Sequence, residues 1–423
     1  MIGDTKMNEE LIKILNYRLK GELPNPFIFD DGTPLRSAAD WERRRAEIYK
    51  STIELQYGTM PPKPDFLRVE LLYTSCSYPN SYRIVTGTKE SPISFIMYVF
   101  RADSKKKAPA VIDGDMCFSY LYDEAFIKAF TDNGIDLVCF NRCELATDVA
   151  AYSLDEIMSG TGEAEIARAA LDEILENGCG GQVKRAYPDY SFGTLGAWAW
   201  GYSRCVDALE ILGFTDMDTI AFTGHSRGGK TAALAGALDE RASIVNPNGS
   251  CSGGYGSYRI SIDAETEDGE IKTSEPLSNI LHHFPAWLGE GMREYVDREE
   301  LLPFDSHYLK ALVAPRALLV TEGASDIMAN PVGSHQTTEA AGEVYKFLGC
   351  EDKLFWQIRS GKHTHGGEDV RALVSVIRHI KYGEPLYEGL FKLPFKPIEK
   401  AYKWTSPERV GDEQIHICQN AKN

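Results

Sequence analysis

Residues 221–236 read AFTGHSRGGKTAALAG and place a serine, Ser226, between an apolar run and a run of small residues. The apolar stretch 218–224 predicts a buried β-strand, and the alanine-rich stretch that begins at Lys230 predicts a helix. Ser226 then lies at the turn between them in the pattern G-x-S-x-G, which is typical of a nucleophile elbow. Such a turn excludes bulky neighbours and lifts the hydroxyl above the sheet at a helix N-terminus. A serine that only caps the helix is the alternative interpretation.

Short apolar runs with helical segments between them occupy most of the chain around this motif. This alternation predicts a parallel sheet covered by helices on both faces. Three earlier β-rich runs, separated by turn residues, predict an antiparallel edge. Together with the elbow, the pattern indicates an α/β-hydrolase fold, a mostly parallel sheet flanked by helices in three layers. The antiparallel runs are 69–75, 82–88 and 93–101, and the parallel ones are 109–115, 135–141, 218–224, 242–249, 317–323 and 354–359.

The length of 423 residues fits one large domain with additions. We expect residues 1–65 to form an N-terminal helical extension packed on the domain, 66–400 to form the catalytic domain, and 401–423 to be a C-terminal tail. The segments 142–192 and 250–300 are too long for simple crossovers. We interpret them as insertions over the carboxyl ends of the strands, where open sheets of this kind bind ligands.

A nucleophilic serine needs a base and an acid, which this fold supplies in the chain order serine, acid, histidine. Asp326 comes just after the strand 317–323, and two histidines follow the strand 354–359. His363 is the preferred base because it lies closer to its strand than His365, which stays open as the alternative. An acid from one of the insertions also stays open. The competing interpretation is that Asp326 starts a turn and that the histidines lie on the surface.

Composition excludes several classes of function. The formal net charge of −17 argues against a nucleic-acid partner, because binding phosphates requires a basic face. No stretch has the apolar length of a signal peptide or a membrane-spanning helix, so we expect a cytoplasmic protein without a membrane partner. The nine cysteines show no CxxC spacing and the histidines no HExxH motif, so we expect neither a zinc site nor a complete disulfide framework. The sequence leaves the oligomeric state open.

Several separated stretches resemble the glucuronoyl esterases, carbohydrate esterase family 15, and in particular their bacterial branch. The match to the elbow is longer than the pentapeptide, because the family motif G-x-S-R-x-G-K appears as GHSRGGK. The resemblance spans most of the chain. The matching stretches are DDGTPLRSAADWERRRAEI, TLGAWAWGYSRCVDALE, TIAFTGHSRGGKTAALAGALDERASIV, LPFDSHYLKALVAPRALLVTEG and the GKH loop.

This resemblance implies an enzyme that cleaves the ester between 4-O-methyl-glucuronic acid on xylan and lignin alcohols, without metal or cofactor. It implies that Ser226 is the nucleophile and His363 the base. Arg227 would lie on the oxyanion side, where a permanent positive charge suits a developing anion. Lys230 would contact the uronate sugar, with a solvated helix residue as the alternative.

The chain departs from the family pattern at three places. Many members carry a catalytic glutamate in a Pro-Gln-Glu-Ser-Gly context, but residues 247–250 read PNGS and contain no carboxylate, so Asp326 is the expected acid. Met328 replaces a tryptophan that packs on the sugar, and Trp287 is the candidate for a replacement platform, with a core residue as its alternative. His225 stands where fungal relatives have a cysteine.

These departures keep two other functions open. One is an esterase of another substrate, such as an acetylated sugar. The other is a non-catalytic relative that binds carbohydrate and has lost the chemistry.

Overall fold

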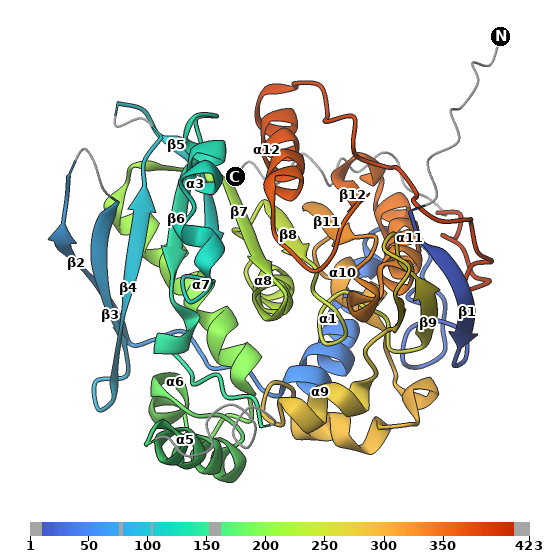
Figure 1. Cartoon of the computed structure of the whole chain (residues 1–423), viewed down its shortest axis with the longest axis horizontal. Helices are drawn as coiled ribbons and strands as arrows, with labels where there is room; N and C mark the ends of the chain where they lie inside the picture. The colour runs from blue at the N-terminus through green and yellow to red at the C-terminus, as the bar shows by residue number, and fades with distance from the viewer. Residues whose placement is uncertain (1–10, 76–78, 103–104, 152–161, 410–423) are drawn as a thin grey trace.

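The computed structural model describes residues 11–75, 79–102, 105–151 and 162–409. Their main feature is a nine-stranded sheet with helices on both faces (Figure 1). Its strands, in chain order, are β2 (Phe66–Tyr73), β3 (Asn80–Gly87), β4 (Pro92–Phe100), β5 (Ala108–Asp113), β6 (Asp136–Phe140), β7 (Thr215–His225), β8 (Ile244–Asn248), β11 (Ala317–Gly323) and β12 (Leu354–Arg359).

The strand order is β12-β11-β8-β7-β5-β6-β4-β3-β2. All neighbours from β12 to β6 pair in parallel, whereas β4, β3 and β2 continue the sheet antiparallel. These three strands form the left edge in Figure 1. The structure therefore confirms the predicted α/β-hydrolase architecture, including the antiparallel edge.

Helices cover the two faces because alternate residues of the buried strands point to opposite sides. The helices of the described residues are α1 (Asp40–Tyr49), α2 (Leu55–Tyr57), α3 (Glu124–Thr131), α5 (Glu163–Asn177), α6 (Gln182–Ala186), α7 (Thr194–Leu212), α8 (Arg227–Leu238), α9 (Leu277–His283), α10 (Ser306–Ala311), α11 (Pro331–Leu348) and α12 (Gly367–Tyr382). Phe222 and Val245 belong to the larger core cluster with α7 and α8, whereas the adjacent Ala221 and Ile244 belong to a second cluster with α3 and α12.

Short 3-10 and π segments complete the connections. The π segment is η1 (Lys50–Glu54), and the 3-10 segments are η2 (Ser119–Tyr122), η3 (Arg142–Glu144), η4 (Glu290–Tyr295), η5 (Glu299–Leu301), η6 (Ile327–Ala329) and η7 (Glu351–Lys353). Two of these, η3 and η6, directly follow the loops at the ends of β6 and β11, so they lie at the carboxyl edge of the sheet.

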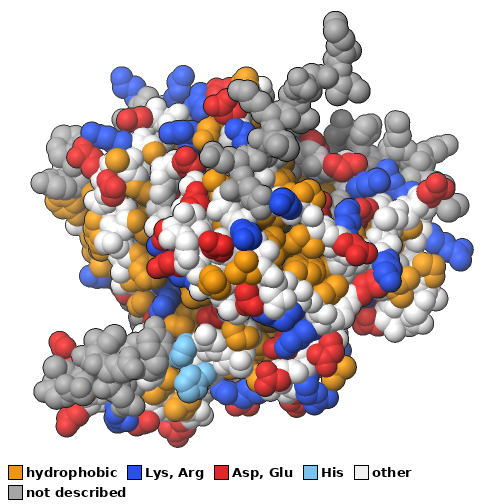
Figure 2. Space-filling model, turned by 45° about the vertical axis from the view of Figure 1, so that its right-hand side comes forward, with side chains coloured by type: hydrophobic (Ala, Val, Ile, Leu, Met, Phe, Trp, Pro, Cys, Tyr) orange, Lys and Arg blue, Asp and Glu red, His pale blue; other side chains and the backbone are white. Residues whose placement is uncertain are grey.

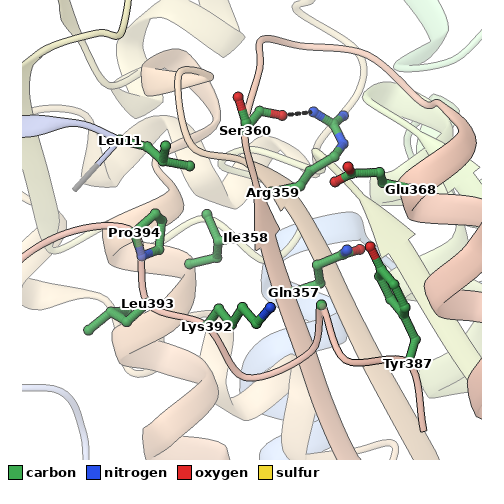
Figure 3. A pocket seen from close by; sticks show the side chains of 11 residues that line it. Leu11, Gln357, Ile358, Arg359, Ser360, Glu368, Tyr387, Lys392, Leu393 and Pro394 are labelled. Carbon is green, nitrogen blue, oxygen red and sulfur yellow. Dashed lines mark hydrogen bonds between the residues drawn. The ribbon is translucent and has the colours of Figure 1, made fainter. Parts of the chain in front are cut away.

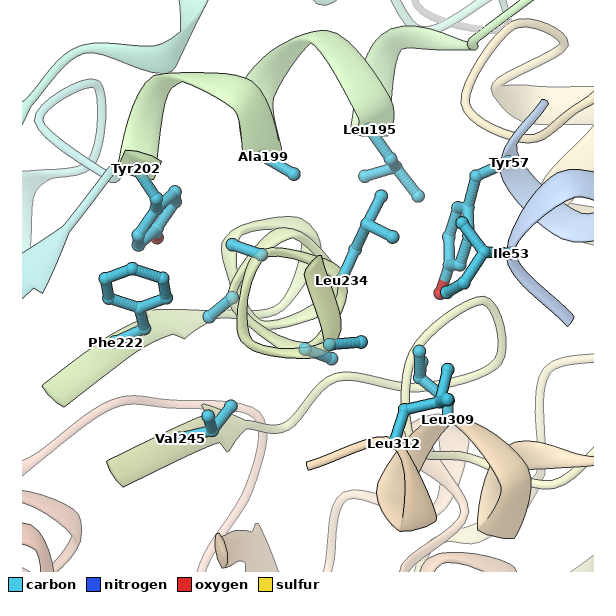
Figure 4. Close-up of a cluster of buried hydrophobic side chains, with 14 of the residues drawn as sticks. Ile53, Tyr57, Leu195, Ala199, Tyr202, Phe222, Leu234, Val245, Leu309 and Leu312 are labelled. Carbon is cyan, nitrogen blue, oxygen red and sulfur yellow. The ribbon is translucent and has the colours of Figure 1, made fainter. Parts of the chain in front are cut away.

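Helix α8, which follows Ser226, is enclosed by other elements (Figure 4). Its residues from Gly228 to Ala237 are all buried. Leu195 and Tyr202 of α7 lie on one side, and Val245 of β8 lies on another. A helix of alanine, glycine and threonine allows this approach because it is small and apolar nearly all round. The elbow is therefore anchored in the largest core cluster.

The N-terminal region differs from the predicted helical extension. It begins with a strand, β1 (Lys13–Leu19), which pairs antiparallel with β9 (Ile260–Glu265), and β10 (Ile271–Thr273) completes this small sheet. Helix α1 follows, but its Trp41 and Ile48 are buried, so it belongs to the core. The region expected to be a helical extension therefore also contains a strand, whose partner comes from the distant 250–300 insertion.

The first part of the expected tail is also packed. The Leu23 N–H donates to the Ala401 carbonyl oxygen at 2.9 Å, and the indole N–H of Trp404 donates to the Leu23 carbonyl oxygen at 2.8 Å. Residues 410–423 of that tail lie outside the described residues. The domain boundaries at 65 and 400 stay predictions.

The surface carries charges of both signs with apolar side chains between them, as Figure 2 shows for one face. In the part of the chain that the structure describes, no helix combines the length and apolarity needed to cross a bilayer. The same residues contain no group of three or more histidine, cysteine or acidic side chains that could hold a metal ion.

Candidate active site

Ser226 lies between β7 and α8 in a backbone conformation that few residues other than glycine adopt. Its φ of 58° and ψ of −118° fall in a region where a Cβ is strained. The Ser226 N–H donates to the Asn248 carbonyl oxygen at 2.9 Å, and the Ser226 carbonyl oxygen accepts from the Lys230 N–H at 2.9 Å. The turn is therefore held from both sides. Strain retained at a turn of this kind is a mark of a functional position.

The glycines of the motif are required by close backbone packing. A Cβ on Gly224 would lie 2.6 Å from the Gly228 carbonyl oxygen, and one on Gly228 would collide with the carboxylate of Asp115. A Cβ on Gly229 would lie 2.6 Å from the Asn248 carbonyl oxygen. The helix thus crosses the strand ends at a distance that only glycine permits, which is the physical reason for the pattern G-x-S-R-G-G.

The structure joins Asp326 and His363, which follow neighbouring parallel strands. Asp326 Oδ2 lies 2.5 Å from His363 Nδ1. The Asp326 side chain is only 3% exposed, whereas that of His363 is 28% exposed. A buried carboxylate on Nδ1 fixes the tautomer of the ring and leaves Nε2 as the basic atom.

His365, the alternative base, has a different environment. It is buried against Tyr120 and Phe126, with ring centroids 5.1 and 5.3 Å away. Both of its ring nitrogens are buried without a hydrogen-bond partner. Burial lowers the pKa of His365 well below its ordinary value. His365 therefore forms part of the apolar wall, and His363 is the histidine that the acid orients.

The loop that carries His363 is held by Arg359, whose hydrogen bond to Ser360 is drawn in Figure 3. The Arg359 guanidinium donates to Asp369 at 2.9 Å, to the Thr364 carbonyl oxygen at 2.6 Å and to the Ser360 carbonyl oxygen at 3.0 Å. Ser360 Oγ in turn donates to Glu267, which belongs to the 250–300 insertion, at 2.8 Å. The loop geometry therefore depends on a buried ion pair and not on the loop sequence alone.

His225, which precedes the nucleophile, packs on the proposed base. Its ring centroid lies 4.5 Å from that of His363, and its Nδ1 lies 2.7 Å from Asn248 Oδ1. Burial, together with the nearby His363, lowers the pKa of His225 to about 4. His225 is therefore neutral at pH 7 and adds no positive charge beside His363.

A cavity of about 440 Å³ opens at these residues. Its lining combines the elbow and the histidine loop with the loop that follows β5. The lining residues are Phe118, Ser119, Tyr120, His225, Ser226, Arg227, His363, Thr364 and His365. The three residues from the β5 loop were not predicted from the sequence, because nothing in the run CFSYLY distinguishes it from an ordinary connection.

A buried charge network below the elbow was also not predicted from the sequence. Asp115 and Arg142 form an ion pair with no exposed surface on either side chain. Asp115 also accepts from the His225 N–H at 2.7 Å and from the Tyr120 hydroxyl at 2.7 Å. Burial raises the pKa of the neighbouring Asp113 to about 7, which hydrogen bonds from Tyr120 and the charge of Arg142 partly offset. This network connects the elbow to the β5 loop.

Arg227 is fixed by the 142–192 insertion. Its Nη1 donates to Asp148 Oδ2 at 2.9 Å, and its guanidinium lies 4.9 Å from the Trp287 ring centroid. The Trp287 indole N–H donates to the other oxygen of Asp148 at 3.2 Å. Because α8 begins at Arg227, the backbone N–H groups of its first turn also point towards the serine end without intrahelical partners.

Trp287 is buried, with 5% of its surface exposed. Its ring stacks on Phe284 at a centroid distance of 3.6 Å, and it also lies against the ring of Trp198 and the cations of Arg227 and Lys230. This burial favours the core interpretation over that of a sugar platform. Met328, in contrast, is 42% exposed on η6, two residues after Asp326, and neither Met328 nor Trp287 lines the cavity.

Lys230 is not the solvated residue that was the alternative from the sequence. It is 2% exposed, and its Nζ lies 5.6 Å from the Trp287 ring centroid. Glu275, from the 250–300 insertion, interacts electrostatically with Lys230 and with His363. Burial raises the pKa of Glu275 above its ordinary value, against the opposing effect of Lys230. The sequence offered no signal for Glu275 because its spacing from the strand ends is irregular.

Comparisons with known proteins agree with this geometry. A family model described as "Glucuronyl esterase, fungi" matches residues 175–349, a range that contains Ser226 and Asp326. The 4-O-methyl-glucuronoyl methylesterase 1 of Wolfiporia cocos is 29% identical over 351 residues, which cover 81% of this chain and 76% of that protein. Carbohydrate esterase MZ0003, from an unknown prokaryotic organism, is 28% identical over 402 residues, which cover 85% of this chain and 90% of that protein.

The structural comparison covers still more of the chain. A carbohydrate esterase family 15 glucuronoyl esterase from Caldicellulosiruptor kristjansonii has a TM-score of 0.74 and 27% identity. The match spans 93% of this chain and 98% of that structure. The similarity therefore extends over most of the chain and is not confined to the elbow.

Proposed function

We propose that this chain belongs to the glucuronoyl esterase family, whose members it resembles, and that it is a carboxylic ester hydrolase that cleaves esters of glucuronic-acid sugars through an acyl-enzyme. One observation carries the proposal. Ser226, on a strained elbow, lines a single cavity with His363, whose Nδ1 is 2.5 Å from the buried Asp326. This is the constellation that activates a serine hydroxyl at neutral pH.

Each side chain has a defined task in this chemistry. The Ser226 Oγ attacks the ester carbonyl while His363 Nε2 takes its proton, and Asp326 stabilises the imidazolium that results. His363 then gives the proton to the leaving alcohol as the carbon–oxygen bond breaks. A water molecule attacks the acyl-enzyme, again losing its proton to His363, and the free acid and Ser226 are restored.

The negative charge that develops on the carbonyl oxygen is stabilised by the start of α8. The Arg227 backbone N–H and its guanidinium supply a donor and a permanent positive charge. Asp148 holds that guanidinium at 2.9 Å, so it is oriented before the substrate arrives. Donors that need no reorganisation during the reaction contribute most to catalysis.

Recognition of the sugar is assigned to Lys230. The carboxyl group of a uronic acid carries no charge while it is esterified, so the ammonium acts as a hydrogen-bond donor to sugar oxygens. Its burial at 2% exposure makes a lost contact costly, because an unsatisfied buried ammonium is strongly disfavoured. Glu275 interacts with Lys230 electrostatically and supports it from the other insertion.

Two measurements test the proposal. The first compares kcat/KM for benzyl glucuronate and methyl glucuronate with that for acetylated xylan and p-nitrophenyl acetate. We expect the glucuronate esters to be turned over most efficiently, and faster turnover of acetylated xylan would favour the acetyl esterase instead. The second is labelling with a fluorophosphonate, which should modify Ser226. An unlabelled protein that still binds xylan fragments would identify a non-catalytic carbohydrate-binding relative.

A further inference from the structure

Two cysteines lie side by side next to the active-site cavity, on segments that are distant in the sequence. Cys117 belongs to the loop after β5, and Cys143 belongs to η3 after β6. Backbone hydrogen bonds join these segments, from the Met116 N–H to the Phe140 carbonyl oxygen at 3.2 Å and from the Arg142 N–H to the Gly114 carbonyl oxygen at 3.1 Å. The two loops therefore leave the sheet together.

Side chains adjacent to the two cysteines connect the same loops. Arg142, the residue before Cys143, forms the buried ion pair with Asp115, two residues before Cys117. The Arg142 guanidinium also lies 4.8 Å from the ring centroid of Phe118, the residue after Cys117. Beyond these neighbours, the thiols of Cys117 and Cys143 are hydrogen-bonding partners of each other.

The pair differs from the other described cysteines in its accessibility. Cys117 is exposed and Cys143 is partly exposed, whereas the remaining cysteines of the described residues are buried. The buried ones are Cys139, Cys179, Cys205, Cys251 and Cys350. A reagent in solution therefore reaches this pair and not those five.

The electrostatic environment divides the roles of the two thiols. The hydrogen bond from Cys117 lowers the pKa of Cys143, and the positive charges of Arg142 and Arg227 lower it further. The same contact raises the pKa of Cys117. A thiolate stabilised beside a thiol is the arrangement that reacts with disulfides, because the thiolate is the nucleophile.

We propose that Cys117 and Cys143 are a redox-active pair. They form a disulfide with each other when they react with a small-molecule disulfide such as oxidised glutathione. The Cys143 thiolate attacks one sulfur of oxidised glutathione and releases one glutathione thiolate, which takes up a proton. The Cys117 thiol then loses its proton and attacks the Cys143 sulfur, releasing the second glutathione. Two protein thiols lose two electrons and two protons, and one oxidised glutathione becomes two reduced ones.

This disulfide would restrain the loop that forms one wall of the cavity. Phe118, Ser119 and Tyr120 follow Cys117 directly and line the cavity. The cross-link would hold their loop against η3 and thereby against Arg142. It closes a loop of about 25 residues, which restricts the unfolded chain and stabilises the folded one. The inference concerns thiol chemistry alone, so it does not depend on the proposed esterase activity.

Peptide mapping tests the cross-link directly. The protein is incubated with oxidised glutathione, its free thiols are alkylated under denaturing conditions, and it is digested with trypsin without reduction. Cleavage after Lys107, Lys128, Arg142 and Arg168 puts Cys117 alone on peptide 108–128 and Cys143 alone on peptide 143–168. We expect these two peptides as one disulfide-linked species that separates on reduction. Peptide 129–142, which carries the buried Cys139, should be alkylated and unlinked, which serves as the internal control.

Two variants complete the test. In Cys117→Ser the linked species should be absent and Cys143 should carry glutathione, and in Cys143→Ser the linked species should also be absent. The apparent Tm of the oxidised wild type should exceed that of the reduced protein by about 5 °C, and Cys117→Ser should show no such difference. Wild-type peptides 108–128 and 143–168 that remain unlinked, each alkylated or joined only to glutathione, would overturn the proposal.

Discussion

Ser226 has two kinds of neighbours, and they are positioned in different ways. Asp326 and His363 follow strands β11 and β12 directly, and a 2.5 Å contact joins them. The neighbours of Arg227 and Lys230 come instead from the two insertions, Asp148 from 142–192 and Trp287 from 250–300. In the proposed mechanism the strand-end side carries the proton transfers, whereas the insertion side supplies the fixed charges. From this difference we infer that the fold sets the proposed reaction and that the insertions set the choice of substrate.

The two sides also differ in how their charges are compensated. On the strand-end side the histidines other than His363 are neutral, since burial lowers the pKa values of His225 and His365. On the insertion side Asp148 pairs with Arg227 at 2.9 Å. One side therefore avoids charge and the other balances it. Substitutions on the two sides should accordingly have different signatures, in kcat on the first and in KM on the second.

The largest effect should come from the nucleophile. Ser226→Ala removes the attacking oxygen and should lower kcat for benzyl glucuronate by more than about 10³-fold, with the Tm nearly unchanged. Steady-state kinetics and a thermal melt measure both. Ser119→Ala removes another hydroxyl from the cavity and should retain at least about a tenth of the activity. Comparable losses of activity in both variants would contradict the assignment of Ser226 as the nucleophile.

The next effect should come from the acid. Asp326→Asn keeps the shape of the side chain but cannot stabilise the imidazolium form of His363, so kcat should fall by about 10²- to 10⁴-fold with a small change in KM. Glu275→Gln alters a carboxylate on the insertion side and should act mainly on KM. The reverse pattern, a large kcat loss only in Glu275→Gln, would show that the acid comes from the insertion.

A pH-dependent change in stability should come from Asp113, beneath the strand-end side. Its pKa in the folded protein is raised to about 7 from an ordinary value of 3.8. Between these values the folded protein keeps a proton that the unfolded chain has lost, so this group destabilises the fold as pH rises. Asp113→Asn should therefore gain about 2 kcal/mol relative to wild type between pH 5 and pH 8. Urea unfolding at both pH values measures this, and an identical difference at each would contradict it.

The smallest effect should come from the insertion side. Lys230→Met keeps most of the volume of this buried side chain but removes its donor, so KM for a glucuronate ester should rise by about tenfold with little change in kcat. A glucose-acetate ester serves as the comparison substrate, and its kinetics should change less. Lys381→Met, at a residue that does not line the cavity and is paired with Asp216, is the control. An equal effect of Lys230→Met on both esters would mean that Lys230 does not distinguish the uronic acid.

Much of the sheet could be predicted from the sequence because its strands are buried on both faces. The run 317–323 was expected as a strand and is observed as Ala317–Gly323, and 354–359 is observed as Leu354–Arg359. Such runs are almost continuously apolar, so they are visible without knowledge of their partners. Strand β1 was missed for the opposite reason. Its residues are half-exposed, and its partner β9 lies about 240 residues away in the chain.

The sequence by itself determined the elbow and the order of its partners. The motif around Ser226 requires glycines because the helix crosses the strand ends closely, and the chain order of Asp326 and His363 follows from the parallel sheet. These are local patterns attached to strand ends, and the positions of strand ends are set by short-range apolar periodicity.

Only the tertiary structure decided which candidates share an environment. It distinguished His363 from His365 by the contact with Asp326, buried Lys230 and Trp287, and brought Asp148 to Arg227 across 79 positions of sequence. These contacts join segments whose separation is set by long insertions without a repeating pattern. Their geometry depends on packing against the whole core. The attraction between two charges that are distant in the chain produces no repeating pattern in the sequence.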